Sequence, residues 1–216
     1  VLGTTFIDDC QWDRSAEYVS AAGWTHNAVN GYYSNTYDKS RWSKDRYGEG
    51  IYEFIFHPIA NATDPDTCGG YMQFFSQGND IAHFCDNTKW VGASYILRFT
   101  AGENKLRLIY NNGVGSGSSV ATTIGTFVMA DALGAVGTPS KIRLEVKNNV
   151  AKLFVNDIEA TNSITLTQGL TEGYFGFCSR YKTTSGSYEF GISGINVIAA
   201  SPDATNGIAA CIPPIG

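Results

Sequence analysis

The chain has 216 residues, of which 16% are charged and 43% hydrophobic, and its formal net charge at pH 7 is −5. This length suits one domain with a sizeable core, and a charged fraction below the usual value of about 25% excludes a disordered chain, a coiled coil and a helical bundle covered by ion pairs. The negative charge makes nucleic acid a poor partner, because phosphate backbones repel an acidic protein.

Short runs in which polar and apolar residues alternate predict β-strands along the whole chain. In chain order the runs are Thr4–Ile7, Ile51–Phe56, Tyr71–Gln77, Tyr95–Thr100, Lys105–Tyr110, Ile142–Val146, Val150–Val155, Gly173–Cys178 and Tyr188–Val197. The linkers Ala101–Asn104 and Lys147–Asn149 are typical of tight hairpins, so neighbouring strands should be antiparallel.

Helical patterns occur only at Ser15–Ala22 and Val128–Val136, and both are too short for the crossover helices of a parallel sheet. Together with the absence of an internal repeat, this predicts an all-β fold. We expect residues 1–216 to form a single-domain antiparallel β-sandwich of jelly-roll type, with one or two short helical turns and with the N- and C-terminal segments adjacent.

The five cysteines are too widely spaced for a zinc site. The simplest arrangement pairs Cys68 with Cys85 and Cys10 with Cys211, which leaves Cys178 as a small buried side chain.

Several features favour a secreted protein. Asn61 begins an Asn-Ala-Thr glycosylation sequon in a loop-like stretch, and disulfides form in oxidising compartments. The sequence has no apolar run of 18 residues that could span a bilayer, and its start lacks the pattern of a signal peptide, as expected for a processed, soluble chain.

Strand alternation places candidate site residues on two semi-polar strand faces. Glu53 and His57 share one face of the strand at Ile51–His57, and Tyr71, Gln73, Phe75 and Gln77 share one face of the strand at Tyr71–Gln77. Because sugars present apolar faces ringed by hydroxyl groups, aromatic rings combined with planar hydrogen-bonding side chains are typical of glycan sites. We therefore expect these faces to meet in one concave, sugar-binding surface.

A second cluster lies between Tyr32 and Tyr47, where aromatic and basic residues are interleaved. Tyr37, Arg41, Trp42 and Tyr47 could form a positive, aromatic-lined edge that binds an anionic polymer. The equal alternative is an edge strand whose charges prevent aggregation.

Several segments resemble the concanavalin A-like lectin/glucanase superfamily, whose members include the laminin-G-like jelly rolls. Lys141–Asp157 is similar to the late hairpin of that superfamily, and Tyr47–Phe54 resembles its opening strand. Gly173–Phe177 and Phe190–Val197 are similar to its closing strands. The family-16 glucanase motif E-x-D-x-x-E and the alginate-lyase motifs R-x-E-x-R and Q-I-H are absent, so the resemblance implies the architecture and, by analogy, polysaccharide binding or cleavage.

An enzyme on the same face would most simply be a polysaccharide lyase. His57 or Tyr181 could remove the proton beside a uronate carboxyl group, while Gln73 and Arg180 neutralise the carboxylate. A glycosidase would need two carboxylates about 5 to 10 Å apart, for which Glu53, Glu189 and Glu145 are the strand-borne candidates.

The leading hypothesis is a secreted protein that recognises extracellular polysaccharide. The alternatives are a lyase and a self-associating subunit of an extracellular filament or coat. No cofactor is required. Calcium is a possible ion for the loop carboxylates to bind, although their spacing matches no calcium motif. These carboxylates are Asp8, Asp9, Asp64, Asp66 and Asp80.

Overall fold

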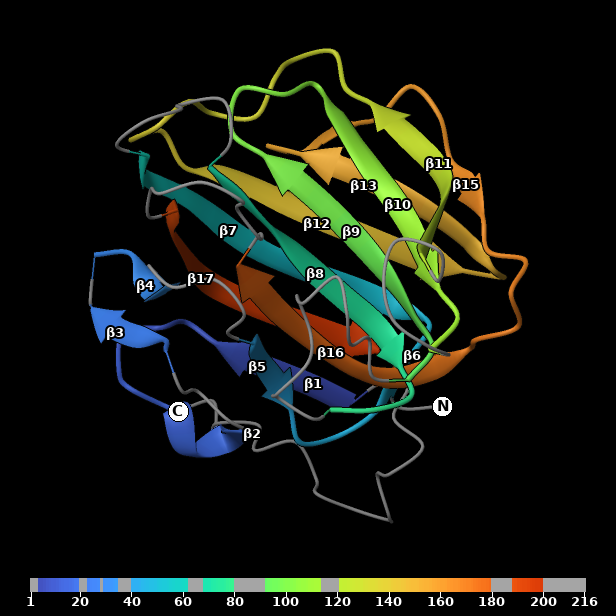
Figure 1. Ribbon diagram of the computed structural model, residues 1–216, viewed down its shortest axis with the longest axis horizontal. Coiled ribbons are helices and arrows are strands. Elements are labelled where there is room, and N and C mark those ends of the chain that lie inside the picture. The colour runs from blue at the N-terminus through green and yellow to red at the C-terminus, as the bar shows by residue number, and fades with distance from the viewer. Residues whose placement is uncertain are drawn as a thin grey trace, which may run out of the picture.

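Two antiparallel sheets packed face to face form a β-sandwich in the computed structural model (Figure 1). In this view β8, β9 and β10 of one sheet cross in front of β7 and β12 of the other. The structure describes residues 4–19, 23–27, 29–34, 40–61, 68–79, 92–113, 121–179 and 188–199. The all-β prediction is confirmed. Over these residues no helix is long and apolar enough to cross a membrane.

The rear sheet in Figure 1 has nine strands among the described residues. Their order is β14 (Ile158–Glu159), β13 (Val150–Val155), β12 (Ser140–Lys147), β7 (Gly50–Asn61), β17 (Tyr188–Ala199), β4 (Gly31–Ser34) and β3 (Thr25–Asn27). In addition, β15 (Ile164–Thr165) pairs with β13, and β1 (Thr4–Asp8) pairs with β17. The first and last described strands are therefore neighbours.

The front sheet has eight strands in the described part of the chain. Their order is β11 (Ala121–Val128), β10 (Lys105–Asn111), β9 (Ser94–Thr100), β8 (Gly69–Ser76), β16 (Glu172–Ser179), β5 (Ser40–Ser43) and β2 (Tyr18–Val19). The short β6 (Tyr47–Gly48) pairs with β16.

Aromatic side chains fill the space between the sheets. Phe54 of β7 contacts Phe99 and Phe177 of the facing sheet, with ring centroids 5.4 and 5.0 Å apart, and all three rings are buried. Since successive strand residues point to opposite faces, this core turns the intervening residues of every central strand outward. The core therefore sets the two outer surfaces.

The turns agree with the predicted hairpins. Asn148 and Asn149 both adopt positive φ between β12 and β13, as a tight hairpin turn requires, and their backbone N–H groups donate to the carboxylate of Glu49. The helical predictions are less accurate. Ser15–Glu17 forms a single 3₁₀ turn, and the expected helix at Val128–Val136 is wrong because the chain continues β11 to Val128 and then runs irregularly.

Phe75 corrects the predicted face of β8. It adopts a φ of 52° beside a register shift between β8 and β16, so two consecutive residues, Phe74 and Phe75, both point into the core. A bulge inserts one extra residue and reverses the alternation after it. Phe75 therefore does not share the outward face of Tyr71 and Gln73.

A polar cluster is enclosed at one end of the sandwich. The guanidinium of Arg41 lies between the rings of Tyr18 and Tyr32, with Cζ 3.7 and 3.3 Å from the two centroids. The Tyr18 hydroxyl donates to the buried carboxylate of Asp8 at 2.8 Å. The tyrosine thus links a buried cation to a buried anion, and this offsets part of the cost of removing both charges from water.

The predicted disulfide pairs are wrong. Cys10 and Cys68 are buried thiols that take part in no disulfide, whereas Cys178 is disulfide-bonded. Spacing along the chain could not reveal that Cys178 points outward from β16, beside Trp42, while Cys10 and Cys68 belong to the core.

The Tyr18→Phe substitution should lower the free energy of unfolding by about 1–3 kcal/mol, because it removes a hydrogen bond from a buried carboxylate. Chemical denaturation measures the change. Tyr110→Phe is the matched control, since no hydrogen bond joins the Tyr110 hydroxyl to a described residue. Equal losses in both variants would contradict the assignment.

Cys10 should resist alkylation in the folded protein. Burial, reinforced by the negative charge of Asp8, raises the pKa of this thiol to about 12, so almost no thiolate forms near neutral pH. Mass spectrometry after iodoacetamide treatment should find Cys10 modified only in denaturant. Rapid modification of the native protein at about pH 8 would refute this prediction.

Candidate functional site

The predicted site residues divide between the two outer faces of the sandwich. Glu53 and His57 lie on β7 of the nine-stranded sheet, while Tyr71 and Gln73 lie on β8 of the eight-stranded sheet. Both strands direct their phenylalanine side chains into the shared core, so the outward-facing residues of β7 and of β8 point away from each other. The expected single surface carrying all four residues is therefore wrong.

The outer face of the nine-stranded sheet is a lattice of paired charges. Arg143 binds Glu145 at 2.9 Å, Lys141 binds Asp157 at 2.6 Å, and Lys152 of β13 binds Glu159 at 2.8 Å. The carboxylate of Glu53 lies 3.9 Å from the Lys141 ammonium. This face therefore satisfies its own charges, and its two described glycosidase candidates, Glu53 and Glu145, are engaged in it.

His57 forms one side-chain contact on this face. Its Nε2 lies 2.6 Å from the Ser193 hydroxyl of β17, and burial lowers its pKa below the ordinary value of 6.5. Among the described residues, no side chain is hydrogen-bonded to Nδ1. A neutral imidazole next to a hydroxyl can move a proton, but the partners proposed for lyase chemistry do not adjoin it: Gln73 is on the other sheet, and Arg180 and Tyr181 lie outside the described residues.

The outer face of the eight-stranded sheet carries a different set of residues, in two cross-strand rows. The first, here called the Tyr71 row, runs across five strands and consists of Cys178, Tyr71, Arg98, Arg107 and Thr126. The second, the Trp42 row, consists of Trp42, Gly176, Gln73, Ile96 and Ile109.

The Trp42 row is mostly buried and supports its neighbour. Trp42 and Gln73 are 1% and 2% exposed, and a Cβ added at Gly176 would overlap the Trp42 indole, so glycine is needed for the ring to lie against the sheet. Tyr71 and Tyr174 pack against the cluster formed by Trp42 and Cys178.

The Tyr71 row becomes more accessible towards β10. Tyr71 and Arg98 are half-buried, Arg107 is exposed, and Thr126 of β11 is half-buried. Since neighbouring strands lie about 4.8 Å apart, the row spans about 14 Å from Tyr71 to Thr126. An aromatic ring, two guanidinium groups and a hydroxyl thus lie in line on one accessible surface.

The remaining predicted residues lie elsewhere. Arg41 and Tyr47 point into the core, which corrects the proposed basic edge: β5 and β6 pair with β16, and their alternation sends these two residues inward. Gln77 is exposed at the end of β8 and donates to the carbonyl groups of Phe75 and Glu172.

Other predictions fall outside the described part of the chain. These are Tyr37, Arg180, Tyr181, Cys85, Cys211, Asp64, Asp66, Asp80 and the side chains of Asn61 and Glu189. Within the described part, no group of three potential metal ligands occurs, and the buried carboxylate of Asp8 instead accepts from Tyr18 and from the Cys10 N–H.

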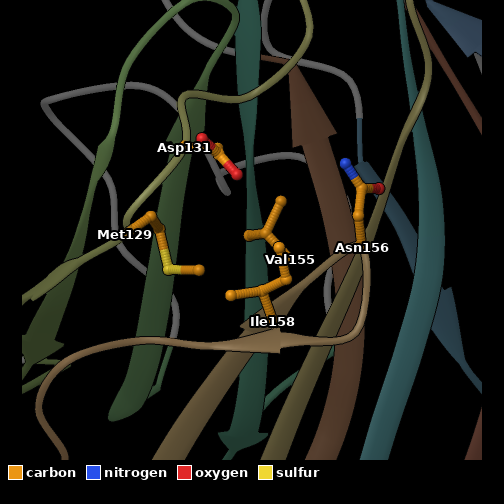
Figure 2. Close-up of a pocket in the computed structure, with 5 residues that line it drawn as sticks. All are labelled: Met129, Asp131, Val155, Asn156 and Ile158. Atoms are coloured by element: carbon orange, nitrogen blue, oxygen red, sulfur yellow. The ribbon is translucent and has the colours of Figure 1, made fainter.

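A small pocket at the edge of the nine-stranded sheet is unrelated to these rows. Figure 2 shows Met129, Val155 and Ile158 around it, with Asp131 and Asn156 at the same opening. Its volume of about 20 Å³ is enough for about one water molecule and is too small for a sugar ring.

Comparison with known proteins identifies the fold. No family model and no curated sequence matches the chain. Solved structures do match: the carbohydrate recognition domain of Emp47p has a TM-score of 0.59 at 13% identity, covering 91% of this chain and 95% of that one. A β-glucanase from Bacillus licheniformis has a TM-score of 0.56 at 13% identity, covering 92% and 99%.

A third similar structure is the carbohydrate-binding module CBM66 from Bacillus subtilis, with a TM-score of 0.54 at 12% identity, covering 81% of this chain and 95% of that one. At these identities the likeness concerns the fold alone. The chain has the concanavalin A-like jelly-roll fold, as the resemblance implied.

The imidazole of His57 should titrate with a pKa below 6.5. Because the unfolded chain then binds a proton more readily than the folded one, this residue's contribution to stability is complete above 6.5 and declines as the pH falls towards the folded pKa. NMR titration, assigned with His57→Gln, measures the value. The variant should also lose less stability than the native chain between about pH 7.5 and 5.5, and a folded pKa of 6.5 or higher would refute the prediction.

Proposed function

We propose that this protein binds polysaccharide through the Tyr71 row on the outer face of its eight-stranded sheet. The observation that carries the proposal is the alignment, on four adjacent strands, of Tyr71, Arg98, Arg107 and Thr126. An aromatic ring can cover the apolar face of a sugar, while guanidinium and hydroxyl groups hydrogen-bond to the oxygen atoms around its rim.

The Tyr71 row is held in place by packing against buried side chains and by strand pairing. Tyr71 packs against the Trp42 and Cys178 cluster, which restricts its side chain before any ligand arrives. Ordering a side chain in advance reduces the entropy lost on binding. A strand-borne row is also held more firmly than a loop, because the strands of Tyr71, Arg98 and Arg107 are paired on both sides and that of Thr126 is paired with β10.

Binding is better supported than cleavage. The described strands of the eight-stranded sheet contain one acidic residue, Glu172, which forms an ion pair with Arg46 at 3.2 Å. A glycosidase needs two carboxylates facing one another across the bond, and the described rows provide none. The lyase alternative would draw on His57 and Gln73, which lie on opposite outer faces.

The fold and the cysteine chemistry are consistent with this proposal. The similar structures include a carbohydrate-binding module, a carbohydrate recognition domain and a glucanase. The disulfide at Cys178 supports the further proposal that the protein is extracellular, since disulfides persist in oxidising compartments.

The Tyr71→Ala substitution should weaken binding by about tenfold, or roughly 1–2 kcal/mol, because it removes the aromatic surface of the row. Tyr71→Phe should retain most of the affinity. A glycan array with the intact protein identifies a ligand, and isothermal titration calorimetry with that ligand measures each dissociation constant.

Phe154→Ala is the matched control, because Phe154 is a half-buried aromatic residue on the outer face of the other sheet. Equal loss of affinity in both variants, or unchanged affinity in Tyr71→Ala, would overturn the assignment of the site. A filament or coat subunit would instead elute as large particles in size-exclusion chromatography and bind no glycan.

A further inference from the structure

The loop between β1 and β2 presents a tryptophan to solvent. Trp12 is 77% exposed, whereas Trp24 and Trp42, the other two tryptophans in the described part of the chain, are 7% and 1% exposed. Leaving an indole in water forgoes the favourable free energy that burial of so large an apolar ring would contribute. An indole that is exposed and also held in place is therefore a candidate contact for a ligand.

The backbone of this loop is held on both sides of Trp12. On one side, Cys10 is buried with a φ of 59°, and the Nε2 of His26 lies 2.8 Å from its carbonyl oxygen. On the other side, the Arg14 N–H donates to the Tyr32 hydroxyl at 2.6 Å, and that hydroxyl donates to the Trp12 carbonyl at 3.4 Å. The indole is thus exposed on a loop whose backbone is bonded to the core.

The side chains next to the indole are hydrogen-bonding groups. Gln11 and Asp13 are both exposed, and no hydrogen bond joins the Gln11 amide to a described residue. One oxygen of the Asp13 carboxylate accepts from the N–H and the hydroxyl of Ser15, at 2.9 and 2.5 Å, which orients the group. These bonds lower the pKa of Asp13, so the carboxylate is ionised near neutral pH. An indole between an amide and a carboxylate can cover a sugar face and hydrogen-bond to its rim.

The charge around the loop favours an uncharged ligand. Asp9 and Asp13 are exposed carboxylates, and Arg14 is paired with Glu17, so this pair adds no net positive charge. The whole chain also carries a net charge of −5. Such a field repels a polymer with carboxylate or sulfate groups, and it repels an anionic membrane surface as well. Sugar hydroxyl groups, in contrast, can donate to these carboxylates.

We infer that Trp12, with Gln11 and Asp13, forms a second carbohydrate-binding site, in which the indole stacks on an uncharged sugar ring. β2, to which the loop leads, is separated from Tyr71 on β8 by β5 and β16, so this site is distinct from the Tyr71 row. The second site rests on the proposed function for its class of ligand. Two sites on one chain would raise the apparent affinity for a long polysaccharide that reaches both.

Tryptophan fluorescence reports on this site directly, because a quencher can reach the exposed indole of Trp12. Acrylamide quenching of the intact protein is measured with neutral cellohexaose, laminarihexaose, xylohexaose and mannohexaose, and with charged hexagalacturonate. At least one neutral oligosaccharide should shift the emission to shorter wavelength and reduce quenching, whereas hexagalacturonate should not. Trp12→Phe should abolish this response, which assigns it to the indole.

Substitutions in a Tyr71→Ala background measure the second site alone. Trp12→Ala should weaken binding of the responding oligosaccharide by about tenfold in isothermal titration calorimetry, because it removes the stacking surface. Gln11→Ala should weaken it roughly two- to fivefold. Both side chains are exposed, so the thermal midpoint of unfolding should not change. Val29→Ala is the matched control, because Val29 is an apolar residue, 81% exposed, in the turn between β3 and β4.

Several outcomes would overturn the second site. One is a fluorescence response that disappears in Tyr71→Ala, since this would indicate a single site. Others are equal weakening by Val29→Ala and Trp12→Ala, and an equal response to hexagalacturonate. Protection of the indole that rises with protein concentration in the absence of sugar would indicate a second copy of the chain as the partner and would also overturn it.

The two sites can fail separately. No fluorescence response to any neutral oligosaccharide, together with glycan binding that depends on Tyr71, would overturn the second site and leave the proposed function in place. Unchanged affinity in Tyr71→Ala, together with a loss in Trp12→Ala, would overturn the Tyr71 row and support the second site.

Discussion

The packing of aromatic rings between the two sheets is the constraint on which the other features depend. Phe54 and Phe56 of β7 are buried against Phe99 of β9, with ring centroids 5.4 and 5.0 Å apart. Fully burying such side chains contributes roughly 1.5–3 kcal/mol each, so their inward direction dominates any preference of the residues between them. Strand alternation then turns those intervening residues to the two outer faces.

The outer faces of the two sheets differ in chemistry, although the same aromatic core sets the direction of the residues on both. On the nine-stranded sheet, Lys141, Arg143 and Lys152 are each paired with a carboxylate, and such a surface interacts mainly with water. On the eight-stranded sheet, an aromatic residue and two guanidinium groups lie in line on strands that hold almost no acid. The difference between the faces, more than any single residue, favours the second as the binding surface.

The interior also holds charge, at the end of the sandwich away from β10. Asp8 and Arg41 are both buried and are linked through Tyr18, which donates to one and stacks on the other. Burying such a group of charges costs desolvation free energy, and removing one partner costs more because it leaves an uncompensated charge in the core. Arg41 is therefore better understood as part of the fold than as a ligand-binding residue.

Alternation along single strands could be predicted from the sequence, and it correctly separated Tyr52 and Phe54 from Glu53, and Met72 and Phe74 from Tyr71 and Gln73. It could not predict which sheet each strand joins, because that depends on pairing between distant segments. The prediction of one surface carrying both Glu53 and Gln73 is wrong for this reason, because the two residues lie on opposite outer faces of the sandwich. Phe75 was misplaced by a bulge, which no periodic pattern reveals.

Arg98 and Arg107 were present in correctly predicted strands but carried no motif. Each lies between core residues in strict alternation, and their significance appears only when β9 and β10 are paired in register. A hairpin register deduced from the turn at Ala101–Asn104 would have placed them side by side, and that was the signal available in the sequence. The disulfide of Cys178 had no such local signal.

Chemical-shift mapping by NMR with a bound oligosaccharide tests the central claim most directly, since it reports on both faces at once. The account predicts the largest amide shifts at Tyr71, Arg98, Arg107 and Thr126, with the amides of Glu53, Arg143 and Lys152 unchanged. The largest shifts on β7, β12 and β13, with the Tyr71 row unaffected, would contradict it.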